Sequence, residues 1–349
     1  MANAFKPITS NDVAVTRTLL HEAIPLSGTI ISGTYNEAVT ADSNIKNYAS
    51  GLFQSVYDYP YLSSSANHVF DITFGYNANS TLSASDSSTV VQQDKKINIY
   101  NEMAQVLMGH DATGSIKEFK IPGGEYIREA YFMSFARLLN KDEISKNNFS
   151  LKLDGLDGAE GAWARPGKQM KPDTITLPTS DNETVFYTDS PAGEYSILSS
   201  SQSGSVGLLF YQAGMAVLGT GSIYSMTGAA ATSVQQTLLN IMTGSSISGS
   251  ADALRHQINT IDFNNTTELN STIYFCRANH NEFNYSSNPT YLSASKILVK
   301  EDTMDEPISY ITTVGLYSPD NELLAVAKIS EPLKKTPTTE LTLRVRLDY

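Results

Sequence analysis

The chain has little cysteine, little tryptophan and little charge. Its single cysteine among 349 residues excludes an internal disulfide and any zinc site built from several thiolates. Charged residues make up 17% of the chain, below the usual quarter, and Ser, Thr, Asn and Gly fill the shortfall. A polar surface with few charges is more typical of stacked strands and packed assemblies than of a freely diffusing helical enzyme.

Basic clusters and long apolar runs are also missing. The chain has 36 acidic against 24 basic residues, a net charge of −12. Binding a nucleic-acid backbone needs clustered Lys and Arg, and the pairs Lys95-Lys96 and Lys334-Lys335 are too small for that. No run of 18 apolar residues is present, and the first residues do not form the apolar segment of a signal peptide. We therefore expect neither a nucleic-acid partner nor membrane insertion.

The motifs of enzymes and metal sites are incomplete. S-x-x-K occurs at Ser43 and again at Ser293, without the companion motifs that would make either serine a nucleophile. Cys276 and His280 form a C-x₃-H pair, but a zinc site needs three or four ligands. The stretch 154–161 lacks the spacing of a calcium loop. We expect no catalytic residue, no cofactor and no bound metal.

What the sequence does contain is strand pattern. Residues 341–349 alternate strictly, which predicts a strand. Turn residues at 318–321 separate two apolar stretches and predict a β-hairpin. Residues 116–155 predict strands of one sheet, the first in the stretch SIKEFKI at 115–121, and residues 206–224 predict further strands that break at Gly214. The expected fold is mainly β with a few helices (α+β), made of antiparallel sheets or a sandwich with helical insertions and a C-terminal β region.

One segment has the spacing of an amphipathic helix. Gly109 lies where a glycine would end that helix. The face at 3.6-residue spacing consists of Ile97, Tyr100, Ala104, Leu107 and Met108.

Other segments are assigned from weaker patterns. Residues 232–244 and 250–258 predict short helices, the second with Ser250 as its N-cap. Apolar residues at helical spacing also cover residues 45–62, whereas residues 28–39 predict a short strand and a turn.

These patterns divide the chain into four regions. We expect a mixed helix and strand region at 1–115 and a β-rich body at 116–228, with a surface loop at 154–171. A short helical segment follows at 229–262, and a C-terminal β domain occupies 263–349.

Two C-terminal segments supply candidate interface residues. Residues 271–296 predict a strand followed by an Asn-rich loop, in which buried aromatic rings would hold the loop in place. The final strand either completes its own sheet or packs onto a neighbouring subunit, because an edge strand offers unpaired N–H and C=O groups. The candidates are Phe283, Tyr285, Tyr291, Leu341, Leu343, Val345, Leu347 and Tyr349.

Several phrases resemble virion structural proteins of T4-like contractile-tailed bacteriophages, especially cyanophages. They include "YDYPYLSSSANHVFDITFGY" at 57–76, "KKINIYNEMAQVLMGHDATGSI" at 95–116 and "MSFARLLNKDEISKNNFSLKL" at 133–153. The phrases "NEFNYSSNPTYLSASKI" at 281–297 and "PISYITTVGLYSPDNELLAVAKISEPLKK" at 307–335 are similar in the same way. The resemblance implies a non-enzymatic subunit of the virion, in the tail or baseplate, assembled in the host cytoplasm. Its partners would be other phage structural proteins and copies of itself.

Two alternatives stay open at this point. The same kind of subunit could decorate the capsid or connect it at the neck. It could also be a host-binding adhesin associated with a fibre, in which a glycan-cleaving activity would need paired carboxylates. Asp154, Asp157 and Glu160 are close in sequence, but they lie in a glycine-rich loop.

Overall fold

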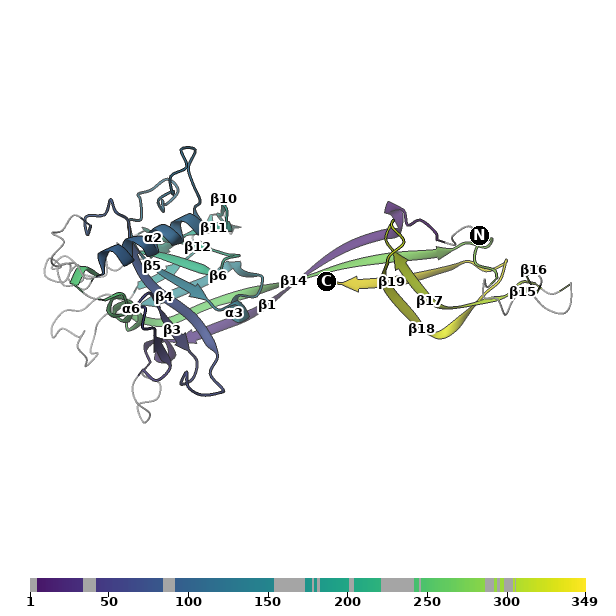
Figure 1. The fold of residues 1–349 in the computed structure, drawn as a ribbon, viewed down its shortest axis with the longest axis horizontal. Helices are drawn as coiled ribbons and strands as arrows, with labels where there is room; N and C mark the ends of the chain where they lie inside the picture. The colour runs from purple at the N-terminus through teal and green to yellow at the C-terminus, as the bar shows by residue number, and fades with distance from the viewer. Residues whose placement is uncertain are drawn as a thin grey trace. The chain divides into compact units, whose positions relative to one another are not determined.

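The computed structural model confirms a mainly β fold (Figure 1). Strands take up 51% of the chain and helices 15%, around a large antiparallel sheet. The structure describes residues 5–33, 42–83, 92–153, 173–177, 179–180, 183–200, 204–220, 242–244, 246–285, 292–293, 296–297, 304 and 306–349.

In chain order, the described elements are a 3₁₀ turn η1 (Ser10–Asp12), β1 (Val13–Ser27), α1 (Gly28–Ser32), β2 (Ile45–Asn47), β3 (Gln54–Tyr57), β4 (His68–Tyr76), α2 (Gln93–Leu107), β5 (Glu129–Phe135), α3 (Arg137–Asn140), β6 (Glu143–Leu153), β7 (Asp173–Thr176), β8 (Thr179–Ser180), β9 (Glu183–Thr184), β10 (Tyr187–Ser190), β11 (Gly193–Ser200), β12 (Gly204–Phe210), β13 (Met215–Gly219), α6 (Ile247–Arg255), β14 (Ile258–Ala278), β15 (Leu292–Ser293), β16 (Lys296–Ile297), β17 (Ser309–Tyr317), β18 (Leu323–Lys335) and β19 (Leu341–Asp348).

The chain forms two compact units. Unit 1 contains residues 1–19 and 268–349, and unit 2 contains residues 20–267. The division therefore falls within β1 and within β14. It lies close to the expected start of a C-terminal β domain at residue 263, but the first 19 residues belong to that unit as well.

Unit 2 is organised around the sheet. Its strand order runs β1-β14-β6-β7-β11-β12-β13-β5-β4-β3-β2, and β10 pairs with β11. Successive residues of β5 alternate between two apolar clusters: Tyr131 and Met133 join one, and Ala130 and Phe132 join the other. Because side chains alternate across a strand, this sheet buries apolar residues on both faces.

The helix α2 covers one of these faces. Its buried residues Ile99, Tyr100, Ala104 and Leu107 join the second cluster, and the helix packs on β4 (Figure 1). The predicted helix is confirmed, and so is its end, because Gly109 has a φ of 73°. The predicted face was incomplete, since Lys96 and Ile99 are buried too.

The strands predicted on either side of Gly214 and the predicted β-hairpin at 318–321 are confirmed. β12 and β13 pair antiparallel and reverse at Gly214, which has a φ of 63°. β17 and β18 pair antiparallel across the turn at 318–322, where the N–H of Ser318 donates to the carbonyl of Glu322. The expected strand at 341–349 is β19, which pairs with β14.

Four local predictions were wrong. Residues 45–62 contain the strands β2 and β3 in place of a helix, and residues 28–32 form the helix α1 in place of a strand. At 115–121 only isolated bridges occur, at Ile116 and Lys120. α6 begins earlier than expected: its N-cap is Ser246, whose hydroxyl accepts from the N–H of Gly249. Most of the helix expected at 232–244, and the loop at 154–171, lie outside the described residues.

Candidate interaction surfaces

Unit 1 buries few apolar side chains. Among its described residues, the buried apolar ones are Ile273, Ala278, Leu316 and Val345, and both apolar clusters of the molecule lie in unit 2. Many more of its large apolar side chains are exposed, namely Phe5, Ile8, Val15, Leu19, Leu269, Phe283, Tyr285, Met304, Tyr310, Tyr317, Leu323, Leu324, Val326 and Tyr349. A unit with so small a core gains little hydrophobic stabilisation from its own chain.

Polar contacts contribute to holding unit 1 together. The N-terminal segment is joined to β14 and the loop after it by three ion pairs: Lys6–Glu282 at 2.5 Å, Asp12–Arg277 at 2.8 Å, and Arg17–Glu268. The hydrogen bond from Lys6 lowers the pKa of the Glu282 carboxyl below its usual value. Pairs this exposed contribute little stability each, because water and salt screen the charges.

The loop after β14 does not bury its aromatic rings. Phe283 and Tyr285 are exposed, so the prediction that buried rings hold this loop was wrong. Tyr291 lies outside the described residues.

The loop is instead held by Lys335, a residue that sequence reasoning missed. Lys335 is fully buried, and its ammonium donates to the carbonyl of His280 at 3.2 Å and to Oδ1 of Asn284 at 2.7 Å. It also donates to the carbonyl of Thr336 at 2.9 Å. A lysine in a Lys-Lys pair before a Thr-Pro-Thr turn gives no sequence signal for such a role, because its acceptors in the loop are 55 and 51 residues away along the chain.

The C-x₃-H pair does not form one cluster with other ligands. Cys276 is half-buried in β14, and burial raises the pKa of its thiol. His280 is exposed in the turn that follows, with Nδ1 3.4 Å from Oε1 of Glu340. Throughout the described part of the chain, no three His, Cys, Asp or Glu side chains gather closely enough to hold a metal ion.

The terminal strand β19 completes its own sheet along one edge. Eight residues of β19 register with β14, from Ser271 opposite Asp348 to Ala278 opposite Leu341. The expected alternation is present: Leu341, Leu343, Val345 and Leu347 face inwards to different degrees, although only Val345 is buried. Tyr349 follows the strand and is exposed, with its hydroxyl 2.8 Å from that of Thr272. Along its other edge, β19 has no strand partner among the described residues.

The hairpin of β17 and β18 has one half-buried face and one exposed face. Gly315 lies opposite Val326, and a Cβ placed on Gly315 would lie 2.9 Å from the ring of Tyr317 and 3.3 Å from the side chain of Leu323. Tyr317, Leu323 and Val326 therefore share the exposed face. Phe5 packs against Tyr317, with ring centroids 4.7 Å apart and ring planes tilted by 54°. These four residues are called the apolar hairpin face below.

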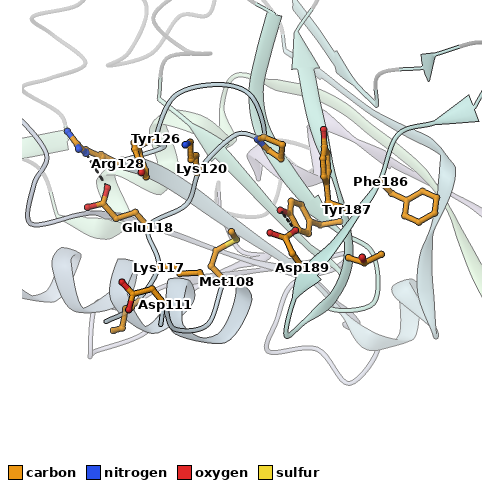
Figure 2. Close-up of a pocket in the computed structure, with 14 residues that line it drawn as sticks. Met108, Asp111, Lys117, Glu118, Lys120, Tyr126, Arg128, Phe186, Tyr187 and Asp189 are labelled. Atoms are coloured by element: carbon orange, nitrogen blue, oxygen red, sulfur yellow. Dashed lines mark hydrogen bonds and ion pairs between the residues drawn. The ribbon is translucent and has the colours of Figure 1, made fainter. Parts of the chain in front are cut away.

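Unit 2 carries an open groove of about 930 Å³ at the end of α2 (Figure 2). Lys120 and Arg128 both lie over the ring of Tyr126, 5.1 Å and 5.6 Å from its centroid. Figure 2 shows Asp189 and Glu118 on different walls of the groove. Asp189 accepts a hydrogen bond from the hydroxyl of Tyr195 at 2.7 Å, and Glu118 pairs with Arg128 at 3.3 Å.

The three carboxylates of this groove therefore each have a partner, Arg128 for Glu118 and the hydroxyl of Tyr195 for Asp189. A third carboxylate, Asp111, accepts from the hydroxyl and the N–H of Thr113, and these hydrogen bonds hold its pKa below the usual value. The groove thus presents aromatic faces beside one ion pair and two hydrogen-bonded carboxylates.

Comparisons with protein-family models, with curated proteins and with solved structures found no match. Within the described ranges, no helix has the length and apolar character that a membrane crossing requires. Of the carboxylates considered for glycan cleavage, all three lie outside the described residues.

Proposed function

We propose that this protein is a non-enzymatic structural subunit of a tailed bacteriophage particle, placed in the tail or baseplate. It acts through several contacts with other phage structural proteins and with copies of itself. The resemblance of the sequence phrases to phage structural proteins supports a place in a phage particle. The exposed apolar side chains of unit 1 support a role in assembly.

The observation that carries the proposal is that unit 1 exposes more large apolar side chains than it buries. Few of its described apolar side chains are buried and many are exposed. β17, β18 and β19 also each have one edge without a strand partner among the residues that the structure describes. Exposed apolar surface and unpaired strand edges make a free protein prone to associate with other chains. In a permanent assembly, the same features are buried against neighbours and stabilise the particle.

The test is to follow the protein into the particle. Phage particles purified from a density gradient are analysed by mass spectrometry and by immunolabelling with an antibody raised against the purified chain. The protein is expected to co-sediment with intact particles and to stay with the tail fraction after heads and tails are separated. A protein that remains monomeric in solution and never co-sediments with particles would contradict the proposal.

The alternative locations give different results in the same experiment. A decoration or neck protein would follow the head fraction, and a fibre-associated adhesin would be lost with the fibres. A reconstruction of the particle by electron cryomicroscopy then assigns the neighbours of each unit.

A further inference from the structure

The apolar hairpin face is large for a surface exposed to water. About half of each side chain of Phe5, Tyr317, Leu323 and Val326 is exposed, and Leu324 beside them is exposed to 68%. With about 150–200 Å² for a side chain of this size, the five together expose on the order of 400 Å². This is within the range of about 300–600 Å² for the largest apolar patch on a monomer, which is often functional. It is also about half of what one partner contributes to a standard interface.

The charges of the two units favour contact between copies at unit 1. Unit 1 has 10 Lys and Arg against 12 Asp and Glu, whereas unit 2 has 14 against 24. Copies of the acidic unit 2 repel one another, while a nearly balanced unit can approach its own copy.

The hairpin is also self-complementary along its length. Asp320 and Glu322 are exposed at its turn. Lys328 is exposed on the apolar face, because its partner Thr313 lies two residues from Gly315. The acidic end and the basic residue are separated by the apolar face itself. When two such hairpins pack antiparallel, each lysine lies beside the carboxylates of the other copy, whereas parallel packing would bring like charges together.

The faces of the hairpin suit a contact between copies better than its edges do. β18 has a β-bulge at Leu324, since Leu316 lies opposite Ala325 while Tyr317 lies opposite Leu323. A bulge disturbs the ladder of N–H and C=O groups and discourages pairing along the edge. It also helps to expose both Leu323 and Leu324.

We propose that the β17–β18 hairpin is a homodimer contact: the apolar hairpin faces of two copies pack antiparallel across a two-fold axis, with Lys328 of each beside Asp320 and Glu322 of the other. The inference rests on the proposed function, a subunit that works by contacts between proteins, and names one partner as a second copy of this chain.

The first test measures self-association of the purified full chain by analytical ultracentrifugation over a wide range of concentration. The wild type is expected to dimerise, and Val326→Asp is expected to raise the Kd by roughly tenfold or more, since the change occurs twice in a symmetric contact. Val15→Asp is the matched control, an exposed valine on β1 outside the apolar hairpin face, and should leave the Kd unchanged. Circular dichroism spectra that match the wild type show that each variant is folded.

The second test exchanges the charges. Lys328→Glu alone and the pair D320K/E322K are each expected to raise the Kd by roughly tenfold, because each brings like charges together. Combining all three substitutions in one chain should restore dimerisation, and mixing the two separate variants should give a heterodimer. A wild type that stays monomeric, or a dimer indifferent to Val326→Asp and to the charge exchange, would overturn the inference.

The two proposals fail separately. A protein found in particles whose hairpin variants behave as the wild type retains the proposed function and loses this contact. A hairpin dimer that never co-sediments with particles retains the contact and loses the proposed function.

Discussion

At the scale of single residues, Arg255 shows how unit 2 uses a buried charge. Its side chain is fully buried, and its guanidinium donates to the carbonyls of Ile31 and Ser32 at the end of α1. It also pairs with Asp252 at 2.7 Å. One side chain thus satisfies helix-end carbonyls that have no partner inside α1, and joins α1 to α6.

Replacing this arginine should be costly. Arg255→Met is expected to lower the free energy of unfolding of unit 2 by about 2–5 kcal/mol, because it removes the donor to two helix-end carbonyls and leaves Asp252 with its hydrogen bond from Gln54. Urea unfolding followed by far-UV circular dichroism measures the loss. The matched control is Arg137→Met, an exposed arginine 3.8 Å from Asp142, which should change the stability by less than about 1 kcal/mol. Equal effects from the two variants would contradict this role.

Lys96 makes a second residue-scale prediction, which concerns pH. It is fully buried on α2, donates to the carbonyl of Met242 at 2.5 Å, and burial lowers its pKa from 10.5 to about 8. Between those two values the unfolded chain binds more protons than the folded one, so stability rises with pH. The gain from pH 7 to 9.5 is expected to be about 2 kcal/mol.

The comparison that isolates this effect is the difference between the wild type and Lys96→Met. Other titrating groups contribute equally to both, including Tyr76 and Tyr211, whose pKa values burial raises to about 12. The variant should lack the rise between pH 8 and 9.5 in thermal unfolding scans. Parallel pH profiles for the two proteins would show that the buried ammonium is not its source.

At the scale of elements, the packing of α2 on β4 depends on Gly75. A Cβ at this position would lie 2.7 Å from the carbonyl oxygen of Lys96 and 2.9 Å from the backbone nitrogen of Tyr100. Gly75→Ala is therefore expected to push the helix from the strand and to destabilise unit 2 by about 1–3 kcal/mol. Gly244→Ala is the control, since a Cβ there meets nothing within 4 Å. A shift in melting temperature for Gly75→Ala no larger than that of the control would refute the close approach.

The elements that sequence predicts correctly are those fixed by local chemistry. α2 has a long 3.6-residue pattern and a terminating glycine, and the hairpins have turn residues of their own. Residues 45–62 mislead because apolar spacing over short stretches fits a helix and two short strands equally well. The sequence does not indicate α1, because its five residues are mostly β-branched or small. In addition, a carbonyl at the end of α1 accepts a hydrogen bond from Arg255, which is 223 residues away from Ser32.

The candidate surface was only partly predictable, because some of its features depend on contacts between residues far apart in the sequence. The strand at 341–348 and the hairpin follow from alternation and turn chemistry. The exposure of Phe283 and Tyr285 does not, because aromatic rings in a loop give no indication of whether the chain supplies a core for them. The loop is held by Lys335 and by an ion pair to Lys6, contacts made across 51 and 276 residues of sequence.

At the scale of the whole molecule, the two units should differ in stability. Unit 2 has both apolar clusters, whereas unit 1 relies on exposed ion pairs, on backbone ladders and on Lys335. In dilute solution, unit 1 is therefore expected to unfold at a lower temperature than unit 2, giving two transitions in calorimetry. Added salt should lower the first transition more than the second, because it screens the ion pairs.

Varying the protein concentration separates the stability that unit 1 gains from its own chain from the stability that it gains from a second copy. If unit 1 is buried against a second copy, its transition rises with concentration, because association stabilises only the folded form. Val326→Asp should remove that dependence and leave the second transition unchanged. Hydrogen exchange of the full chain, read peptide by peptide, assigns each transition to its residues: those of β17, β18 and β19 should exchange before those of β4 and β5. A single cooperative transition, with equal protection in both sets of strands, would show that unit 1 is as stable as unit 2 and needs no partner to fold.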